Sequence, residues 1–161
     1  MASGVSGNSP SVEAWNGSTW TPTVLSIPSP FTSVLVNSVS CTTPSSCMIV
    51  GEALAGNDSP YAEFWNGSSW QAAAPFPALP PSTNTFLYSV SCVGDNFFCA
   101  AVGTTNSGHN IVFTWNGGVW ANSTVPSPSG GSDLNAISCF SATSCTAVGQ
   151  VGPGYTDSQT L

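Results

Sequence analysis

The side chains of this chain best suited to chemistry are its carboxylates and a histidine, at positions that repeat. Glu13 and Glu63 each precede a tryptophan by two residues, where a third copy of the phrase has Phe113. Two carboxylates in neighbouring repeats have the chemistry of an acid–base pair for hydrolysis, to which His109 adds a further base or ligand. Glu52 follows a glycine, and with Glu13 and Glu63 it supplies the carboxylate oxygens that calcium prefers. These side chains are the catalytic and metal-binding candidates.

Each candidate also has a structural interpretation, which we favour. A buried glutamate in a chain without cations must find donors, so Glu13 and Glu63 are expected to accept hydrogen bonds from a turn or an indole N–H. His109 stands where the other repeats have Ser9 and Ser59, and no nucleophile elbow accompanies it. We therefore predict no cofactor, with a divalent ion such as calcium as the alternative.

The six tryptophans occur in three copies of one phrase: EAWNGSTW at 13–20, EFWNGSSW at 63–70 and FTWNGGVW at 113–120. An Asn-Gly pair between alternating apolar residues predicts a β-hairpin with a two-residue type I′ loop. With such a loop at 16–17, Trp15 would pair with Ser18 and Glu13 with Trp20. We predict that the tryptophans form core between sheets. The alternative is a sugar-stacking surface, whose binding residues would be Glu13, Trp15, Glu63, Trp65 and Trp115.

Six cysteines form three close pairs with five or six residues between the partners: Cys41 and Cys47, Cys92 and Cys99, and Cys139 and Cys145. Zinc sites prefer two to four intervening residues, so the spacing favours disulfides made in an oxidising compartment. The N-terminal stretch MASGVSGNSP has no basic or apolar signal-peptide region. We therefore expect a mature or excised segment of an exported, extracellular or cell-surface protein.

The charge balance excludes two classes of partner. The chain has no Lys or Arg against seven acids, which gives a formal net charge of -7. No cation is available to neutralise phosphate, so nucleic acid and anionic membrane surfaces are not expected as partners. No run of eighteen apolar residues is present either, so we predict no transmembrane segment.

The elements that position these residues recur with a period near fifty, which is typical of stacked supersecondary units. A second phrase alternates with the tryptophan phrase: NSVSCTTPSSCMIVG at 37–51, YSVSCVGDNFFCAAVG at 88–103 and NAISCFSATSCTAVG at 135–149. Each phrase is predicted to be a hairpin, and no segment has helical periodicity. The fold class is all-β, and four short strands per repeat with Pro-rich connections describe one blade of a β-propeller.

The pattern S-C-x5-C-x-A-V-G followed by W-N-G-x-x-W resembles the kelch-type or galactose-oxidase-like β-propeller repeats of secreted bacterial proteins. It differs from the kelch pattern in one respect, because a single Gly51, Gly103 or Gly149 stands where a Gly-Gly doublet is expected. The predicted organisation is an N-terminal extension at 1–11, an outer hairpin at 12–24, blades at 35–74 and 86–125, an inner hairpin at 133–150 and the start of a further strand at 151–161, so that the propeller segment covers 12–161.

Three blades are too few for a ring, because propellers typically have about four to eight. The unpaired first and last hairpins are complementary, so we predict a six-bladed homodimer made by half-blade exchange. The expected function is an extracellular, lectin-like binding module for a glycan or another small molecule. A hydrolase acting on a phosphoester, ester or glycoside through carboxylates and a bound metal is one alternative, and a structural exoprotein is another.

Overall fold

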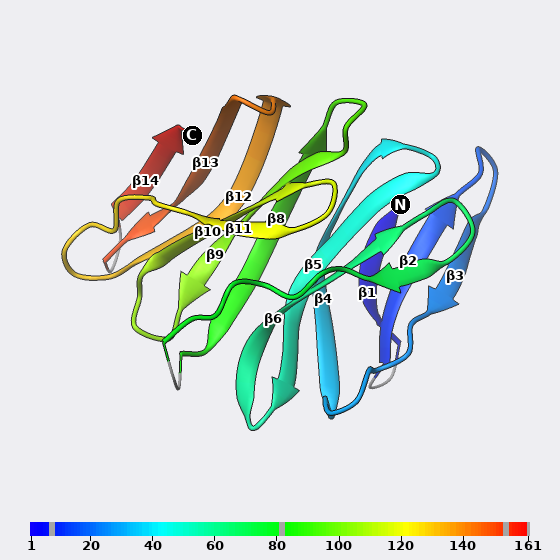
Figure 1. Ribbon diagram of the computed structural model, residues 1–161, viewed down its shortest axis with the longest axis horizontal. Helices are drawn as coiled ribbons and strands as arrows, with labels where there is room; N and C mark the ends of the chain where they lie inside the picture. Colours follow the sequence, from blue (N-terminus) through cyan, green and yellow to red (C-terminus); the bar gives the residue numbers. More distant parts are fainter. Residues whose placement is uncertain (7–8, 81–82, 153–154, 161) are drawn as a thin grey trace.

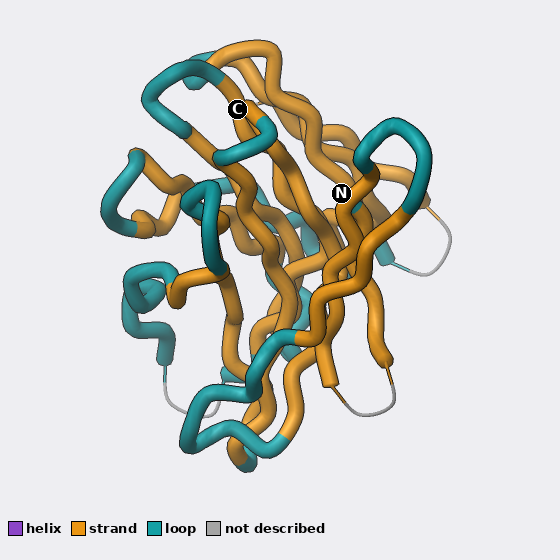
Figure 2. Tube along the Cα trace, turned by 90° about the vertical axis from the view of Figure 1, so that its right-hand side faces the viewer, coloured by secondary structure: helices purple, strands orange, loops and turns teal. Residues whose placement is uncertain are grey.

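The computed structural model describes residues 1–6, 9–80, 83–152 and 155–160 as antiparallel strands and loops, with no helix among them. Figure 1 shows four sheets side by side, and Figure 2 shows the same strands and loops from the side of the N-terminal sheet. No helix long and apolar enough to cross a membrane occurs in the described ranges. The strands are β1 (Ala2–Ser6), β2 (Ser9–Trp15), β3 (Trp20–Val24), β4 (Ser33–Thr43), β5 (Ser46–Ala55), β6 (Asn57–Trp65), β7 (Trp70–Ala72), β8 (Thr85–Val93), β9 (Phe98–Thr105), β10 (Asn110–Asn116), β11 (Trp120–Ser123), β12 (Ser132–Ser141), β13 (Ser144–Val151) and β14 (Tyr155–Thr160).

The predicted all-β fold is confirmed, and the sheets follow the chain in order. The second sheet is β4-β5-β6-β7 and the third is β8-β9-β10-β11, two four-stranded meanders close to the predicted blades. The first sheet is β1-β2-β3 and the fourth is β12-β13-β14. Where we expected an extension before one hairpin and a strand start after another, β1 pairs with β2 and β14 pairs with β13. Each terminal sheet therefore has three strands.

The tryptophan hairpins have a longer loop than predicted. Trp15 pairs directly with Trp20, and the 16–19 stretch forms a four-residue loop, so the two-residue type I′ loop is wrong. The Asn16 side chain closes this loop, because its Oδ1 accepts hydrogen bonds from the backbone N–H groups of Ser18 and Thr19, both at 2.9 Å. Positive φ is needed at Gly17 alone. The Trp15 and Trp20 rings consequently face each other, with centroids 5.5 Å apart.

The three predicted disulfides are confirmed, and each lies within one sheet. They join the facing ends of the first two strands of the second, third and fourth sheets, with Cα–Cα distances of 3.9–4.0 Å. No free cysteine occurs among the described residues. The bridges are Cys41–Cys47, Cys92–Cys99 and Cys139–Cys145.

The glycine that ends each cysteine phrase is required by a β-bulge in the neighbouring strand. In the second sheet the bulge lies between Val36 and Ser38, opposite Gly51. A Cβ at Gly51 would collide with the Leu35 carbonyl oxygen, and Gly103 and Gly149 meet the same obstacle in their sheets. A single glycine per repeat is thus sufficient for this geometry.

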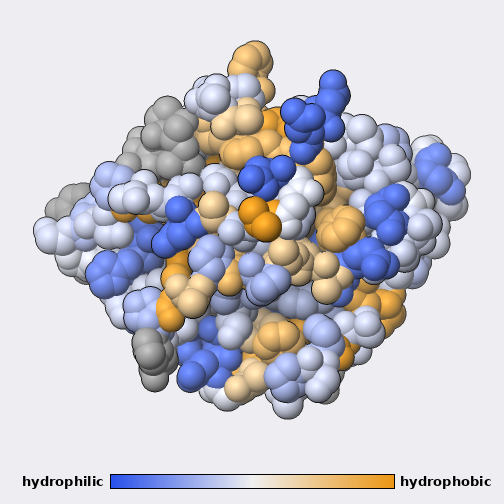
Figure 3. Space-filling model, viewed as in Figure 1, coloured by the Kyte–Doolittle hydropathy of each residue, from blue (hydrophilic) through white to orange (hydrophobic). Residues whose placement is uncertain are grey.

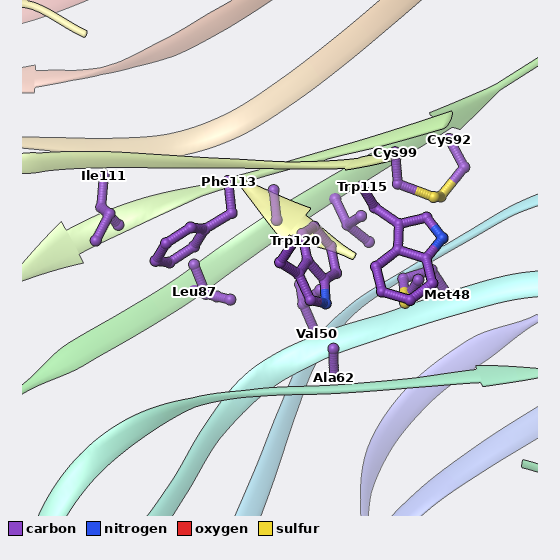
Figure 4. Packing of buried hydrophobic residues seen from close by; sticks show 12 residues of the cluster. Met48, Val50, Ala62, Leu87, Cys92, Cys99, Ile111, Phe113, Trp115 and Trp120 are labelled. Atoms are coloured by element: carbon purple, nitrogen blue, oxygen red, sulfur yellow. A yellow bond between two sulfur atoms is a disulfide. The ribbon is translucent and has the colours of Figure 1, made fainter. Parts of the chain in front are cut away.

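The hydrophobic core lies between the sheets. The largest cluster joins the second and third sheets and includes Met48 and Val50 on one side and Phe113, Trp115 and Trp120 on the other (Figure 4). Two further clusters fill the spaces between the first and second sheets and between the third and fourth sheets. Each sheet thus buries one face against the next, as propeller blades do.

Hydrogen bonds to serine hydroxyls also join the first strands of the second, third and fourth sheets, which are β4, β8 and β12. In each bond a backbone N–H donates to the hydroxyl of a serine on the preceding first strand, at 2.9–3.2 Å. These bonds explain the small serine that the first two cysteine phrases carry within their strands. The donor and acceptor pairs are Val90 with Ser38, Cys92 with Ser40, Ile137 with Ser89, and Cys139 with Ser91.

Candidate functional site

The repeated tryptophan and glutamate positions lie on the same face of each sheet. In the second and third sheets this face points toward the preceding sheet, and in the first sheet it is the outer face. On the first sheet Glu13 is exposed and Trp15 is 50% exposed. Trp65 is half-buried on the second sheet, and Trp115 is buried on the third. The predicted binding residues are therefore distributed over three sheets and do not form one site.

The other candidates are likewise separate. Glu52 accepts a hydrogen bond of 2.7 Å from the Asn37 side chain. Burial raises the pKa of Glu52; the hydrogen bond from Asn37 opposes this rise, and the negative charge of Asp58 adds to it. His109 is an exposed turn residue whose carbonyl oxygen accepts from the Thr105 N–H at 3.0 Å. Among the described residues, no group of three His, Cys, Asp or Glu side chains is placed to hold a metal ion.

Glu63 is the one buried acid among the residues whose burial is described, and its hydrogen-bond donor is a tyrosine. The Tyr61 hydroxyl donates to Glu63 Oε1 at 2.6 Å, and both side chains are buried on the face toward the first sheet. Burial raises the pKa of Glu63, and the hydrogen bond from Tyr61 opposes that shift. Burial, the hydrogen bond to Glu63 and its charge raise the pKa of Tyr61, so the tyrosine remains a donor. The pair is a fixed polar element of the second sheet.

Tyr61 also lines a groove of about 550 Å³ along the outer edge of β6. One wall is formed by β6 residues between positions 57 and 62, and the other by linker residues between positions 73 and 80 and by Thr83, which follow β7 and are drawn in green in Figure 1. Phe31, from the linker before β4, closes one end. Three aromatic rings contribute to this lining, because Phe76 of the long linker joins Phe31 and Tyr61.

In the second sheet the linker after β7 lacks the hydrogen bonds that attach the corresponding linkers of the first and third sheets to their strands. In the third sheet the linker after β11 is attached to β10 by Asn110, whose N–H donates to the Ser127 hydroxyl at 3.0 Å and whose amide donates to the Pro126 carbonyl at 3.1 Å. The strand registers place Pro60 of β6 at the position of Asn110. Proline has no N–H and no amide side chain, so this attachment is lost in the second sheet.

A second proline has the same effect from the linker side. After the first sheet the Leu25 N–H donates to the Pro10 carbonyl at 2.9 Å, which holds the linker on β2. The residue at the equivalent place after β7 is Pro75, which cannot donate. The last such bond of this linker is from the Ala73 N–H to the Ala62 carbonyl, at 3.2 Å. Beyond it the linker separates from β6 and the groove begins.

Polar side chains at the groove are available to a ligand. Asn57, Ser59 and Thr83 line it, and their side chains make no hydrogen bond to another described residue. A concave site with apolar and aromatic walls and a few free polar groups is the usual form of a small-molecule site. The face of the molecule shown in Figure 3 is mostly weakly polar, with scattered hydrophilic and hydrophobic patches. The arrangement can bind a molecule that has both an apolar face and hydroxyl groups.

The sequence predictions missed this groove. Its lining residues come from β6 and from two linkers, and the tryptophan and cysteine phrases include none of the three aromatic rings. The available signal was the substitution of Pro60 for the Asn110 of the next repeat, together with the aromatic residue in the linker PFPALPP.

Comparison with known proteins gives a match at the level of fold. No family model matches the chain, and no curated protein matches it significantly. The structure is similar to that of a mutant of the Aleuria aurantia lectin in complex with α-methyl-L-fucoside, with a TM-score of 0.66 and 16% sequence identity. The match covers 96% of this chain and 50% of the lectin chain, so this chain spans half the length of that protein. Together with the four antiparallel sheets, this likeness confirms the β-propeller fold.

Proposed function

We propose that this protein is a carbohydrate-binding module and that the groove beside β6 holds a neutral saccharide. The observation that carries the proposal is the lining of the groove, where aromatic rings and free hydroxyl and amide groups meet in one concavity. Aromatic rings offer the apolar face on which a pyranose ring stacks, and the polar groups fix its orientation through hydrogen bonds. The fold likeness to a lectin solved with a fucoside supports the same class of ligand.

The charge of the chain limits the class further. With no Lys or Arg and a net charge of -7, no cation is available to pair with a carboxylate or a sulfate. The field of the seven acids would also repel such groups. Sialylated, uronic and sulfated glycans are thus disfavoured, and neutral hexoses or deoxyhexoses are favoured.

The hydrolase alternative has less support. Glu13, Glu63 and His109 belong to the first, second and third sheets, and Glu63 is already paired with Tyr61. An acid–base pair would have to assemble from residues that the fold keeps on separate sheets. We therefore propose binding without turnover.

A glycan array that contains neutral and acidic sugars, followed by calorimetric titration of the best ligand, tests the proposal. The expected result is binding of neutral glycans alone, and Asn57→Ala should weaken it about 5–10-fold through loss of one hydrogen bond. An absence of binding up to about 10 mM of each common neutral monosaccharide would contradict the proposal.

Two matched variants locate the site. Ser59→Phe places a ring inside the groove and should abolish binding, whereas His109→Phe changes the equivalent position of the third sheet, where the linker is attached to the strand. The His109 variant should bind as the unchanged protein does. Equal loss in both variants, or none in either, would place the ligand elsewhere, and thermal unfolding would confirm that both remain folded.

We further propose that the protein acts outside the cell, as a homodimer. Three disulfides support an oxidising compartment. Half-blade exchange is one route to the dimer. In that route β1 and β14 would have to leave β2 and β13, because each now occupies a place that a strand of the partner would take.

A further inference from the structure

The outer face of the first sheet, defined here by Trp15, Trp20 and Val24, is an uncovered apolar surface. These side chains are 50%, 50% and 60% exposed. The face lies at the end of the row of sheets in Figure 1 and is turned toward the viewer in Figure 2. Burying these two indoles and the valine would be favourable, because apolar side chains in water are less stable than in contact with other apolar groups. Their exposure therefore indicates an interaction surface.

The third sheet reveals what covers such a face. Trp115 and Trp120 occupy the positions of Trp15 and Trp20, yet each is only 4% exposed. They are covered by β5 of the preceding sheet: Figure 4 shows Trp115 close to Met48 and Trp120 close to Val50, within one packed cluster. In this fold a tryptophan hairpin thus packs against the second strand of the preceding sheet, on the side of that strand that faces the hairpin.

The same kind of surface is uncovered once more, at the other end of the row. By the register that aligns the second cysteine of each bridge, Thr146 and Val148 of β13 correspond to Met48 and Val50 of β5. Met48 and Val50 are fully buried, whereas Thr146 is exposed and Val148 is 46% exposed. Phe140, 92% exposed, also belongs to the fourth sheet. One chain therefore carries both halves of an intersheet interface, at opposite ends.

We infer that the outer face of the first sheet binds the β13 face of the fourth sheet of a second copy of this chain. The inference deepens the proposed homodimer by naming its contact, and it does not depend on glycan binding. The contact repeats the packing found between the second and third sheets, with Trp20 against Val148 and Trp15 against Thr146. Two such contacts related by twofold symmetry use both ends of both copies.

This contact leaves every strand in its own sheet. The hydrogen bonds of β1 to β2 and of β14 to β13 remain, whereas half-blade exchange would have to break them. Because only preformed faces come together, association requires no partial unfolding, and the two modes are distinguishable by which residues touch.

Light scattering on single-face variants tests the inference. The full chain should give about twice its 16.4 kDa mass at about 100 μM. Trp20→Ser removes one face and Val148→Asp the other, and each should weaken self-association at least tenfold. Because each variant keeps the face that the other lacks, an equimolar mixture should form a 1:1 dimer. Val119→Ser, which removes an exposed apolar side chain away from both faces, should change nothing.

Photo-crosslinking identifies the contact itself. Benzoylphenylalanine in place of Trp20 should capture the 146–148 segment of the other copy, found by a protease that cuts at aromatic or acidic residues since the chain has no Lys or Arg. A monomer at every concentration would overturn the inference and the homodimer together. A dimer that survives Trp20→Ser, or one crosslinked elsewhere, would overturn this contact and leave the homodimer standing.

Discussion

The tryptophan hairpins of the first and third sheets have the same motif and opposite surroundings. Trp15 and Trp20 pair across their hairpin with ring centroids 5.5 Å apart, and Trp115 and Trp120 do so at 5.4 Å. The first pair is half exposed and the second is buried. Phe76 adds a stacked ring to the third-sheet pair, with its centroid 4.7 Å from that of Trp120. The local hairpin is thus independent of its environment, and the neighbouring sheet together with its linker decides whether it becomes core.

The largest expected difference is between truncating the two pairs. Trp115→Ala removes a buried ring from the main cluster and should lower the free energy of unfolding by about 3–5 kcal/mol. Trp15→Ala, in protein dilute enough to be monomeric, should lower it by about half as much, about 1.5–2.5 kcal/mol, because half of that ring is already in water. Urea denaturation measures both, and equal losses would mean that the first sheet is covered in solution.

The disulfides should show the same contrast at a smaller scale. Removing any bridge frees a short loop and should cost about 2 kcal/mol. Replacing both Cys92 and Cys99 by Ala should cost about 1 kcal/mol more than replacing both Cys41 and Cys47, because Cys92 and Cys99 are both buried whereas Cys41 is exposed. Thermal and urea unfolding of the two double variants provide the comparison, and a larger loss of stability in the Cys41 and Cys47 variant would contradict it.

The serine hydroxyls offer a finer test. Ser91→Ala leaves the Cys139 N–H without its acceptor at 2.9 Å and should cost about 1 kcal/mol. Ser138 stands at the equivalent position of the fourth sheet, is exposed, and makes no such bond to a described residue. Ser138→Ala should therefore change the monomer's stability by less than about 0.5 kcal/mol. Comparable losses in dilute protein would indicate that Ser138 has an acceptor role that this structure does not contain.

The last contrast is between the buried Glu63 and the exposed Glu13, and here the substitution of the buried residue is expected to stabilise the fold instead of destabilising it. Burial raises the pKa of Glu63 above its ordinary 4.5, so the stability that its protonated form contributes is present below that pH and is lost as the pH rises through the folded-state pKa. Glu63→Gln keeps an acceptor for Tyr61 and should stabilise the fold at neutral pH, with no gain in acid. Glu13→Gln should have no comparable effect. Urea unfolding from pH 3 to 8 tests this, and a neutral-pH loss of stability in Glu63→Gln would contradict it.

The sequence predicted the parts of the fold that are built locally. Each cysteine phrase contains both strands, the bulge glycine and the bridge within about fifteen residues, so its pattern defines one hairpin. The strand β1 was not predicted, because ASGVS lacks the apolar alternation of the other strands. The start of a strand was predicted within 151–161, where β14 lies. The four-residue loop was missed because the Asn16 side chain, rather than the backbone alone, closes it.

The candidate site was less accessible to sequence reasoning. The glutamates and tryptophans were predicted as site residues because they repeat. Repeated positions, however, form the contacts between sheets, which every blade needs. The groove exists where one repeat has proline at both places: Pro60 matches Pro10 of the first repeat, but Pro75 stands where the other repeats have Leu25 and Val125. Predicting the groove would require knowing which hydrogen bonds attach the linkers of the first and third sheets, and these bonds are visible only in the structure.

The placement of each bridge within a single sheet has a consequence for oxidative folding. Six cysteines can pair in about fifteen ways, but the native partners are six or seven residues apart, whereas cysteines of different repeats are separated by about fifty. Loop-closure entropy favours the short loop by about 1.7 kcal/mol, or roughly 20-fold per bridge. In an oxidising compartment each bridge can close as soon as its own hairpin has formed, without waiting for the other repeats, so mispaired intermediates and the demand on a disulfide isomerase should both be small.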